Sequence, residues 1–189
     1  IIRNQENAIN ELKRISERAT SEKNNQINLI VENILQDVKD HGDIAVEKYT
    51  KQFDGFYPKP MQISTKELEN AWNEINDSLK SSLQVASERI KKFHEKEIPP
   101  SFTIKGNYGE SVQRKWMPVK TAGIYVPGGR ASYPSTVLMN AIPAKVAGVK
   151  EILMVSPGDE NGLINKTVLA AAYLSGIHKV FRIGGAQAI

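Results

Sequence analysis

Two glycine pairs, each directly after a short apolar run, are the features of this sequence most suggestive of a ligand site. Pro127-Gly128-Gly129 follows the run ending at Val126, and Gly184-Gly185 follows the run ending at Ile183. A glycine turn at the end of a strand lets backbone N–H groups approach a ligand, and the positive end of the next helix favours an anion. Neither stretch matches G-x-G-x-x-G or the phosphate loop. The pairs predict a ligand crevice; the structural alternative is two tight turns.

Tyr125 and Gln187 flank the two glycine turns with groups that suit a polar ring-bearing ligand. A tyrosine at the end of a strand offers a flat ring and a hydroxyl. A glutamine in the first turn of a helix donates and accepts hydrogen bonds at once. The residues alone favour simpler interpretations, a core strand residue for Tyr125 and a solvated helix start for Gln187.

Metal-ligating and nucleophilic residues are scarce. The chain has no cysteine, which excludes disulfides and thiolate metal sites within it. Its three histidines, His41, His94 and His178, are not paired with one another at metal-ligand spacing. We therefore predict no metal ligand and no catalytic residue within these 189 residues.

The charge is unevenly distributed. Residues 1–100 hold 15 Lys/Arg and 17 Asp/Glu, whereas residues 101–189 hold 10 and 4. The basic excess accompanies the glycine turns, and besides aiding solubility it is typical of a field that attracts an anionic ligand. Nucleic acid is not an expected partner, because basic runs interleaved with aromatic residues are missing. No apolar run approaches the roughly 18 residues of a membrane span, so we expect a cytoplasmic protein with no membrane contact.

The elements that position the two turns alternate between strand and helix after residue 119. Strands are predicted at 121–126, 151–155 and 179–183, with helices at about 135–146 and 165–176. Such a βαβαβ pattern predicts a parallel sheet, and ligands bind at the carboxyl ends of its strands.

The first hundred residues read as helical. Between Ile27 and Val38, apolar residues recur every three or four positions and predict an amphipathic helix. Ser64 and Glu67 form a capping box before another helix, and residues 102–117 predict a hairpin.

The predicted fold is therefore α/β. A helix-rich region with a short hairpin (1–118) precedes an incomplete Rossmann-like parallel βαβαβ unit (119–189). The chain stops four residues into an expected helix, and a single turn does not offset the cost of helix nucleation. This pattern is expected of the front part of a longer protein.

Several stretches together resemble one enzyme family. They are "DVKDHGDIAVEKYTKQFDGF" (37–56), "ASERIKKFHEKE" (86–97), "GIYVPGGRASYPSTVLMNAIPAKVAGVKEILMVSP" (123–157) and "RIGGAQAI" (182–189). They resemble the N-terminal portion of histidinol dehydrogenase. The resemblance implies an NAD- and zinc-dependent oxidoreductase of histidine biosynthesis, an intertwined homodimer that oxidises L-histidinol through L-histidinal to L-histidine.

The resemblance also implies roles for particular residues. Tyr125 and Gln187 match positions that contact NAD in that family. The family's Glu-His acid/base pair, its zinc ligands and most substrate contacts lie further along the chain than Ile189, so the chain alone is expected to be inactive. The alternative is a stand-alone α/β module that binds a nucleotide or another anion without catalysis. A nucleic-acid binder would rest on charge alone.

Overall fold

The computed structural model describes residues 4–17, 22–55, 57–128 and 133–189. The helices are α1 (Gln5–Glu17), α2 (Glu22–His41), α3 (Asp43–Asp54), α4 (Thr65–Glu74), α5 (Asp77–His94), α6 (Pro134–Val146), α7 (Lys166–Leu174) and the 3-10 turn η1 (Ala186–Ala188). The strands are β1 (Gln62–Ile63), β2 (Phe102–Lys105), β3 (Ser111–Arg114), β4 (Thr121–Tyr125), β5 (Glu151–Ser156) and β6 (Lys179–Arg182). Contacts group the chain into two compact units, residues 54–184 and residues 1–53 with 185–189. The division predicted after residue 118 stays a prediction.

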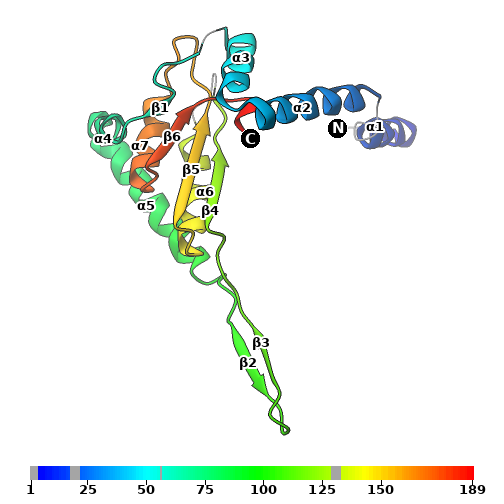
Figure 1. Ribbon diagram of the computed structural model, residues 1–189, viewed down its shortest axis with the longest axis vertical. Coiled ribbons are helices and arrows are strands. Elements are labelled where there is room, and N and C mark those ends of the chain that lie inside the picture. The colour runs from blue at the N-terminus through cyan, green and yellow to red at the C-terminus, as the bar shows by residue number, and fades with distance from the viewer. Residues whose placement is uncertain (1–3, 18–21, 56, 129–132) are drawn as a thin grey trace. The chain divides into compact units, whose positions relative to one another are not determined.

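The larger unit contains a four-stranded sheet in the order β1-β6-β5-β4 (Figure 1). β4 pairs with β5 and β5 with β6, both in parallel, while the short β1 adds an antiparallel edge to β6. The predicted parallel βαβαβ arrangement is confirmed. The predicted strand ends differ from the observed ones by a single residue.

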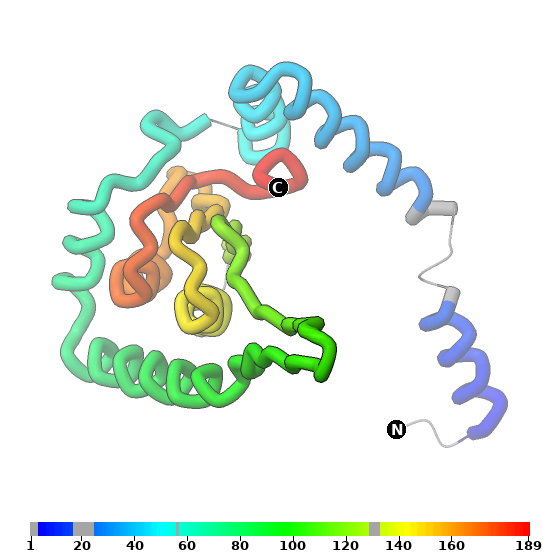
Figure 2. Tube along the Cα trace, turned by 60° about the horizontal axis from the view of Figure 1, so that its bottom comes forward, coloured from blue at the N-terminus to red at the C-terminus, as the bar shows by residue number. Residues whose placement is uncertain are grey.

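One face of this sheet is covered by two layers of helices. The inner layer is α6 and α7, which contact each other, and the outer layer is α4 on α7 and α5 on α6 (Figure 2). Strand residues that point to these helices, Ile124, Ile152, Met154 and Val180, are buried in one core with apolar residues of all four helices. The strands therefore owe their burial on this face to helices from both sides of the predicted division.

The opposite face of the sheet is partly open. Strand side chains alternate between the two faces, so Tyr125, Leu153, Val155 and Phe181 lie on the face away from the helices. Tyr125 is exposed and the other three are partly exposed. Parallel sheets of this type normally carry helices on both faces. The Rossmann-like unit is therefore incomplete in the sense that, among the described residues, helices cover only one face of its sheet.

The predicted hairpin is confirmed. β2 pairs with β3 in antiparallel register from Phe102↔Arg114 to Lys105↔Ser111, and all eight residues are exposed. Next to the hairpin, the Arg114 guanidinium lies 4.6 Å from the centre of the Trp116 ring.

The smaller unit is built around the corner between α2 and α3. Gly42, with a positive φ of 55°, ends α2, and its N–H donates to the Val38 carbonyl at 2.8 Å. η1 packs against α2. Of the apolar face predicted on α2, Ile34 is buried whereas Ile27 and Ile30 are exposed.

The predicted capping box of α4 is only half formed. The Ser64 hydroxyl oxygen accepts from the Glu67 N–H at 3.2 Å, as expected of an N-cap. The Glu67 carboxylate does not complete the box and instead accepts hydrogen bonds from Arg182 on β6. This long-range partner replaces the local one that the sequence pattern predicted.

Candidate functional site

The candidate site lies where the carboxyl ends of the parallel strands meet. Tyr125 at the end of β4 is in register with Val155 on β5, which is in register with Phe181 on β6. The turns that follow β4 and β6 therefore leave the sheet at the same edge. The prediction that the strands before the two glycine turns are parallel, with their carboxyl ends pointing the same way, is confirmed.

Pro157, just past the end of β5, packs between the two turns. A Cβ atom on Gly128 would lie 2.4 Å from the Pro157 carbonyl oxygen, and one on Gly184 would lie 2.7 Å from the Pro157 Cβ. Only glycine allows the three strand ends to approach this closely. These two glycines thus serve packing, where the sequence interpretation stressed access for a ligand. Gly129 lies outside the described residues.

A cavity of about 320 Å³ opens beside Pro157, at the ends of β4 and β5 and the start of α7. Its wall includes Gly128, Ser156 and Asn165. Asn165 caps α7, because its side-chain oxygen accepts from the Thr167 N–H at 2.9 Å. The first turn of α7 therefore brings a positive helix end to a cavity that glycine and proline line on its other side, an arrangement that suits a ligand with both apolar and anionic parts.

The loop that completes this wall is fixed from within. The Asp159 Oδ1 atom accepts from the N–H groups of Asn161 and Leu163, both at 2.9 Å. A Cβ on Gly158 would lie 2.6 Å from the Gly162 carbonyl carbon, so the loop closes tightly on itself. The cavity thus has a preformed wall.

Tyr125 lies at this edge and on the open face of the sheet. The residue is 37% exposed in this chain. Its hydroxyl oxygen would be 3.1 Å from a Cβ on Gly184, so the tyrosine reaches across from β4 to the turn after β6. The ring is therefore accessible while its hydroxyl end is held at the second glycine turn.

Gln187 belongs to the smaller unit and is buried, with 4% of its surface exposed. The alternative of a solvated helix start is therefore wrong. Its side chain folds back toward Gly185, because a Cβ atom on Gly185 would lie 2.4 Å from the Gln187 Oε1 atom. The backbone angles of Gly185, a φ of 69° and a ψ of −174°, also favour glycine at that position. Among the described residues neither amide atom of the side chain has a hydrogen-bond partner. A buried unpaired amide costs about 1–3 kcal/mol, so this group is suited to bonding a ligand.

No metal centre is formed by the part of the chain that the structure describes. It holds no group of three or more His, Cys, Asp or Glu side chains placed to bind an ion. His41 is bonded to Asp37, and His94 to Glu97. The described residues do not fit a zinc site.

Two components of this region escape a reading of the sequence. Pro157 marks the end of a strand, but nothing in the sequence says that both glycine turns pack on it. Arg182 and Glu67 are 115 positions apart and form the part-buried contact that links β6 to α4.

Among the described helices, none is long and apolar enough to span a membrane.

Comparison with known proteins identifies the family. The family model described as histidinol dehydrogenase matches residues 17–189. A histidinol dehydrogenase of Prochlorococcus marinus subsp. pastoris is 75% identical over the whole chain, which covers 44% of that protein. One from Gloeobacter violaceus is 44% identical over 181 residues, 95% of this chain and 41% of that protein.

The fold agrees with a solved member. The crystal structure of histidinol dehydrogenase from Elizabethkingia anophelis matches with a TM-score of 0.80 and 38% identity, over 86% of this chain and 37% of that one. The chain thus spans less than half the length of these relatives. It belongs to the histidinol dehydrogenase family of oxidoreductases.

Proposed function

We propose that this chain is the cofactor-binding part of an NAD- and zinc-dependent histidinol dehydrogenase, which oxidises L-histidinol through L-histidinal to L-histidine in the cytoplasm. The observation that carries the proposal is the edge of the sheet where Tyr125, Pro157, Gly128 and Gly184 meet beside a cavity of about 320 Å³. Family membership supplies the reaction, since the relatives are named for it.

The residues at this edge fit a dinucleotide. NAD, when bound, supplies the acceptor for a hydride. The exposed Tyr125 ring offers a face for stacking, and the start of α7 favours a phosphate. In the smaller unit, the unpaired amide of Gln187 has a donor and an acceptor to offer. We assign Tyr125 and Gln187 to the cofactor on these grounds and on the resemblance of their motifs.

Zinc, the acid/base residues and most contacts to L-histidinol are assigned to chain beyond residue 189. The described part of this chain offers no ligand set for the metal. None of the described residues is therefore assigned to the metal. What this chain does in the reaction is to bind and orient the dinucleotide.

A homodimer is part of the same proposal. On α1, the apolar residues Ile9, Leu12 and Ile15 are exposed at 46–66%. On α2, Ile27 and Ile30 are exposed at 49% and 57%. Apolar stripes of this kind are usually covered by another protein surface. A monomeric mass of the full-length enzyme in solution would contradict this part.

Replacing Tyr125 tests the cofactor assignment. In the full-length enzyme carrying this chain, Tyr125→Ala should raise the KM for NAD by about five- to thirty-fold, because a stacked ring or a hydrogen bond contributes about 1–2 kcal/mol. The KM for L-histidinol should change less. The variant Tyr125→Phe keeps the ring and removes the hydroxyl, so it shows which of the two groups contributes to NAD binding. Steady-state kinetics with each substrate varied in turn measures both constants.

Tyr108→Ala is the matched control, since Tyr108 is 97% exposed on the turn of the hairpin. It should leave both constants unchanged. An unchanged KM for NAD in Tyr125→Ala would end the assignment. Binding of NAD by a full-length protein that does not oxidise L-histidinol would favour the non-catalytic module.

A further inference from the structure

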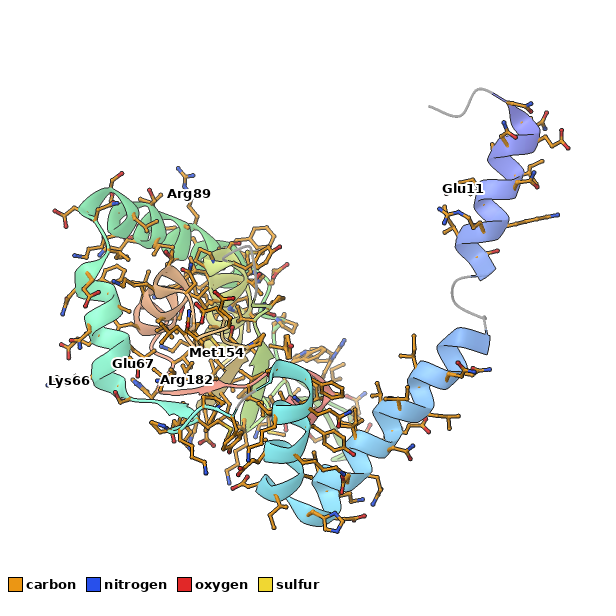
Figure 3. The ribbon with its side chains drawn as sticks, turned by 90° about the horizontal axis from the view of Figure 1, so that it is seen from above. Glu11, Lys66, Glu67, Arg89, Met154 and Arg182 are labelled. Carbon is orange, nitrogen blue, oxygen red and sulfur yellow. The ribbon has the colours of Figure 1, made fainter. Side chains whose placement is uncertain are left out.

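Arg182 is the last residue of β6, and its charge is paired inside the larger unit. Its side chain is only 15% exposed, and its Nη2 donates to both carboxylate oxygens of Glu67, each at 2.9 Å (Figure 3). Glu67 is in the first turn of α4, where a carboxylate is also favoured by the helix dipole. The pair therefore ties the carboxyl end of β6 to the start of α4.

The main chain holds the same point from a second direction. The Arg182 N–H donates to the Met61 carbonyl oxygen at 2.9 Å, and the neighbouring residue Phe181 is in register with Gln62 of β1. Backbone and side chain of Arg182 thus fix one position of β6 against both β1 and α4. This is the position from which the glycine turn departs.

The turn has little freedom to move. Two residues after Arg182, a Cβ on Gly184 would lie 2.7 Å from Pro157 and 3.1 Å from the Tyr125 hydroxyl oxygen. Any shift of the end of β6 carries Gly184 into, or away from, the wall of the candidate site. We propose that Arg182 and Glu67 are positioning residues for the cofactor, acting through the placement of Gly184 beside Pro157 and Tyr125. This inference rests on the proposed function.

Lysine does not replace arginine in this setting. One guanidinium nitrogen meets both carboxylate oxygens, while the Arg182 Nε is buried without a partner in the described part of the chain. A flexible ammonium presents a different geometry and hydration, so Arg182→Lys should keep the charge and lose the fixed placement.

The same strand supplies a matched control. At its amino end, Lys179 forms an ion pair with Glu151, which also accepts from the Thr121 hydroxyl. This pair joins β6 to the other strands but lies at the end remote from the glycine turn. If the ion pairs on β6 only stabilised the fold, loss of either pair would change the melting temperature without a selective rise in the KM for NAD.

The experiment compares variants in the full-length enzyme carrying this chain. The KM for NAD should rise by about five-fold in each of the single variants Arg182→Lys, Arg182→Gln and Glu67→Gln. In the double variant Glu67→Gln/Arg182→Gln, the KM for NAD should be no higher than in the more strongly affected single variant, as expected of a coupled pair. The KM for L-histidinol should stay within about two-fold. Lys179→Gln and Glu151→Gln should leave both constants unchanged.

Melting temperatures separate positioning from stability, and Glu67→Gln preserves side-chain shape if an arginine variant fails to fold. An unchanged KM for NAD in the Arg182 and Glu67 variants would overturn the inference, as would an equal rise in the control pair. If Tyr125→Ala raises the KM for NAD and these variants do not, the inference fails alone. If Tyr125→Ala has no effect, the proposed site itself fails and the inference fails with it.

Discussion

At the scale of residues, Pro157 occupies space that side chains at positions 128 and 184 would need. The two glycines come from turns 56 residues apart in sequence, and both meet the same proline. Their effect on a ligand is therefore indirect. They let the ends of β4, β5 and β6 converge, and convergence creates the edge at which Tyr125 is exposed.

Adding a methyl group tests this packing. Gly128→Ala and Gly184→Ala should each destabilise the protein by about 1–3 kcal/mol, as is usual for overpacking. Gly128→Ala should be the worse, because its Cβ would meet a backbone oxygen at 2.4 Å, whereas Gly184 faces a proline ring. Denaturant unfolding measures both. Gly123→Ala, on β4 with nothing within 4 Å of the added Cβ, is the control and should not destabilise. Equal losses at all three positions would contradict the packing role.

The two predicted cofactor residues differ in how far the sequence could place them. The alternation of side chains along β4 puts Tyr125 on the face opposite Ile124. Whether that face is covered depends on other segments of the protein, which the sequence of β4 does not reveal. The burial of Gln187 has no local signal at all. Gln187 belongs to η1, which contacts α2 more than 140 residues earlier in the chain, and its side chain lies beside Gly185.

At the scale of elements, Asp37 holds the corner between α2 and α3. Its carboxylate accepts from the Lys48 ammonium at 2.7 Å and is bonded to the His41 ring at 2.7 Å. The hydrogen bond from Lys48, followed by that from Tyr49, lowers the pKa of Asp37 from 3.8 to about 2. The ionised form is therefore favoured in the folded protein.

This pKa shift has a defined sign for stability. Above pH of about 4 both states carry the charged carboxylate, and the stabilising contribution is complete. On acidification the unfolded state binds its proton first, so the contribution falls between about pH 4 and pH 2. Asp37→Asn should lower the melting temperature at pH 7 and flatten its decline over that interval. Asp40→Asn, on the same helix and without a cation partner among the described residues, is the control. Parallel melting curves of Asp37→Asn and wild type down to pH 2 would contradict the role.

The elements themselves were largely predictable because their ends carry local chemistry. Ser64 and Asn165 cap α4 and α7 through their own side chains, and positive-φ glycines follow α2 and α6. What local chemistry does not contain is which helices meet. The contact of α4 with α7 joins segments about 100 residues apart, and the Glu67 carboxylate leaves its capping box for Arg182 because a part-buried cation is the stronger partner.

At the scale of the whole molecule, large apolar side chains are exposed in both units. In the smaller unit they include Leu12 on α1 and Ile30 on α2. In the larger unit they include Ile104 on the hairpin and Tyr125 on the open face of the sheet. Apolar surfaces of this kind are usually covered by another protein surface. This supports the proposal that a second copy, or the remaining length found in the relatives, covers these faces.

The fold class was predictable at this scale because the alternation of strand and helix is a property of the chain itself. The complete site was not, because we assign the acid/base residues and metal ligands of the proposed reaction to other parts of the protein. The sequence of this chain can predict only the part of the site that its own residues form.

The chain by itself should therefore be inactive. Oxidation of an alcohol by NAD needs a group to accept the hydroxyl proton, and the proposed reaction also uses a metal to polarise the oxygen. The described residues include no metal-binding group, and His41 and His94 are each engaged with a carboxylate. Purified residues 1–189, made in a host without its own histidinol dehydrogenase, should produce no NADH from L-histidinol and retain no zinc after dialysis. The full-length enzyme carrying the same chain should produce NADH from L-histidinol and retain zinc, and adding a chelator should abolish its activity. NADH production by the chain alone would show that the acid/base function lies within these 189 residues and would require a different assignment of the site.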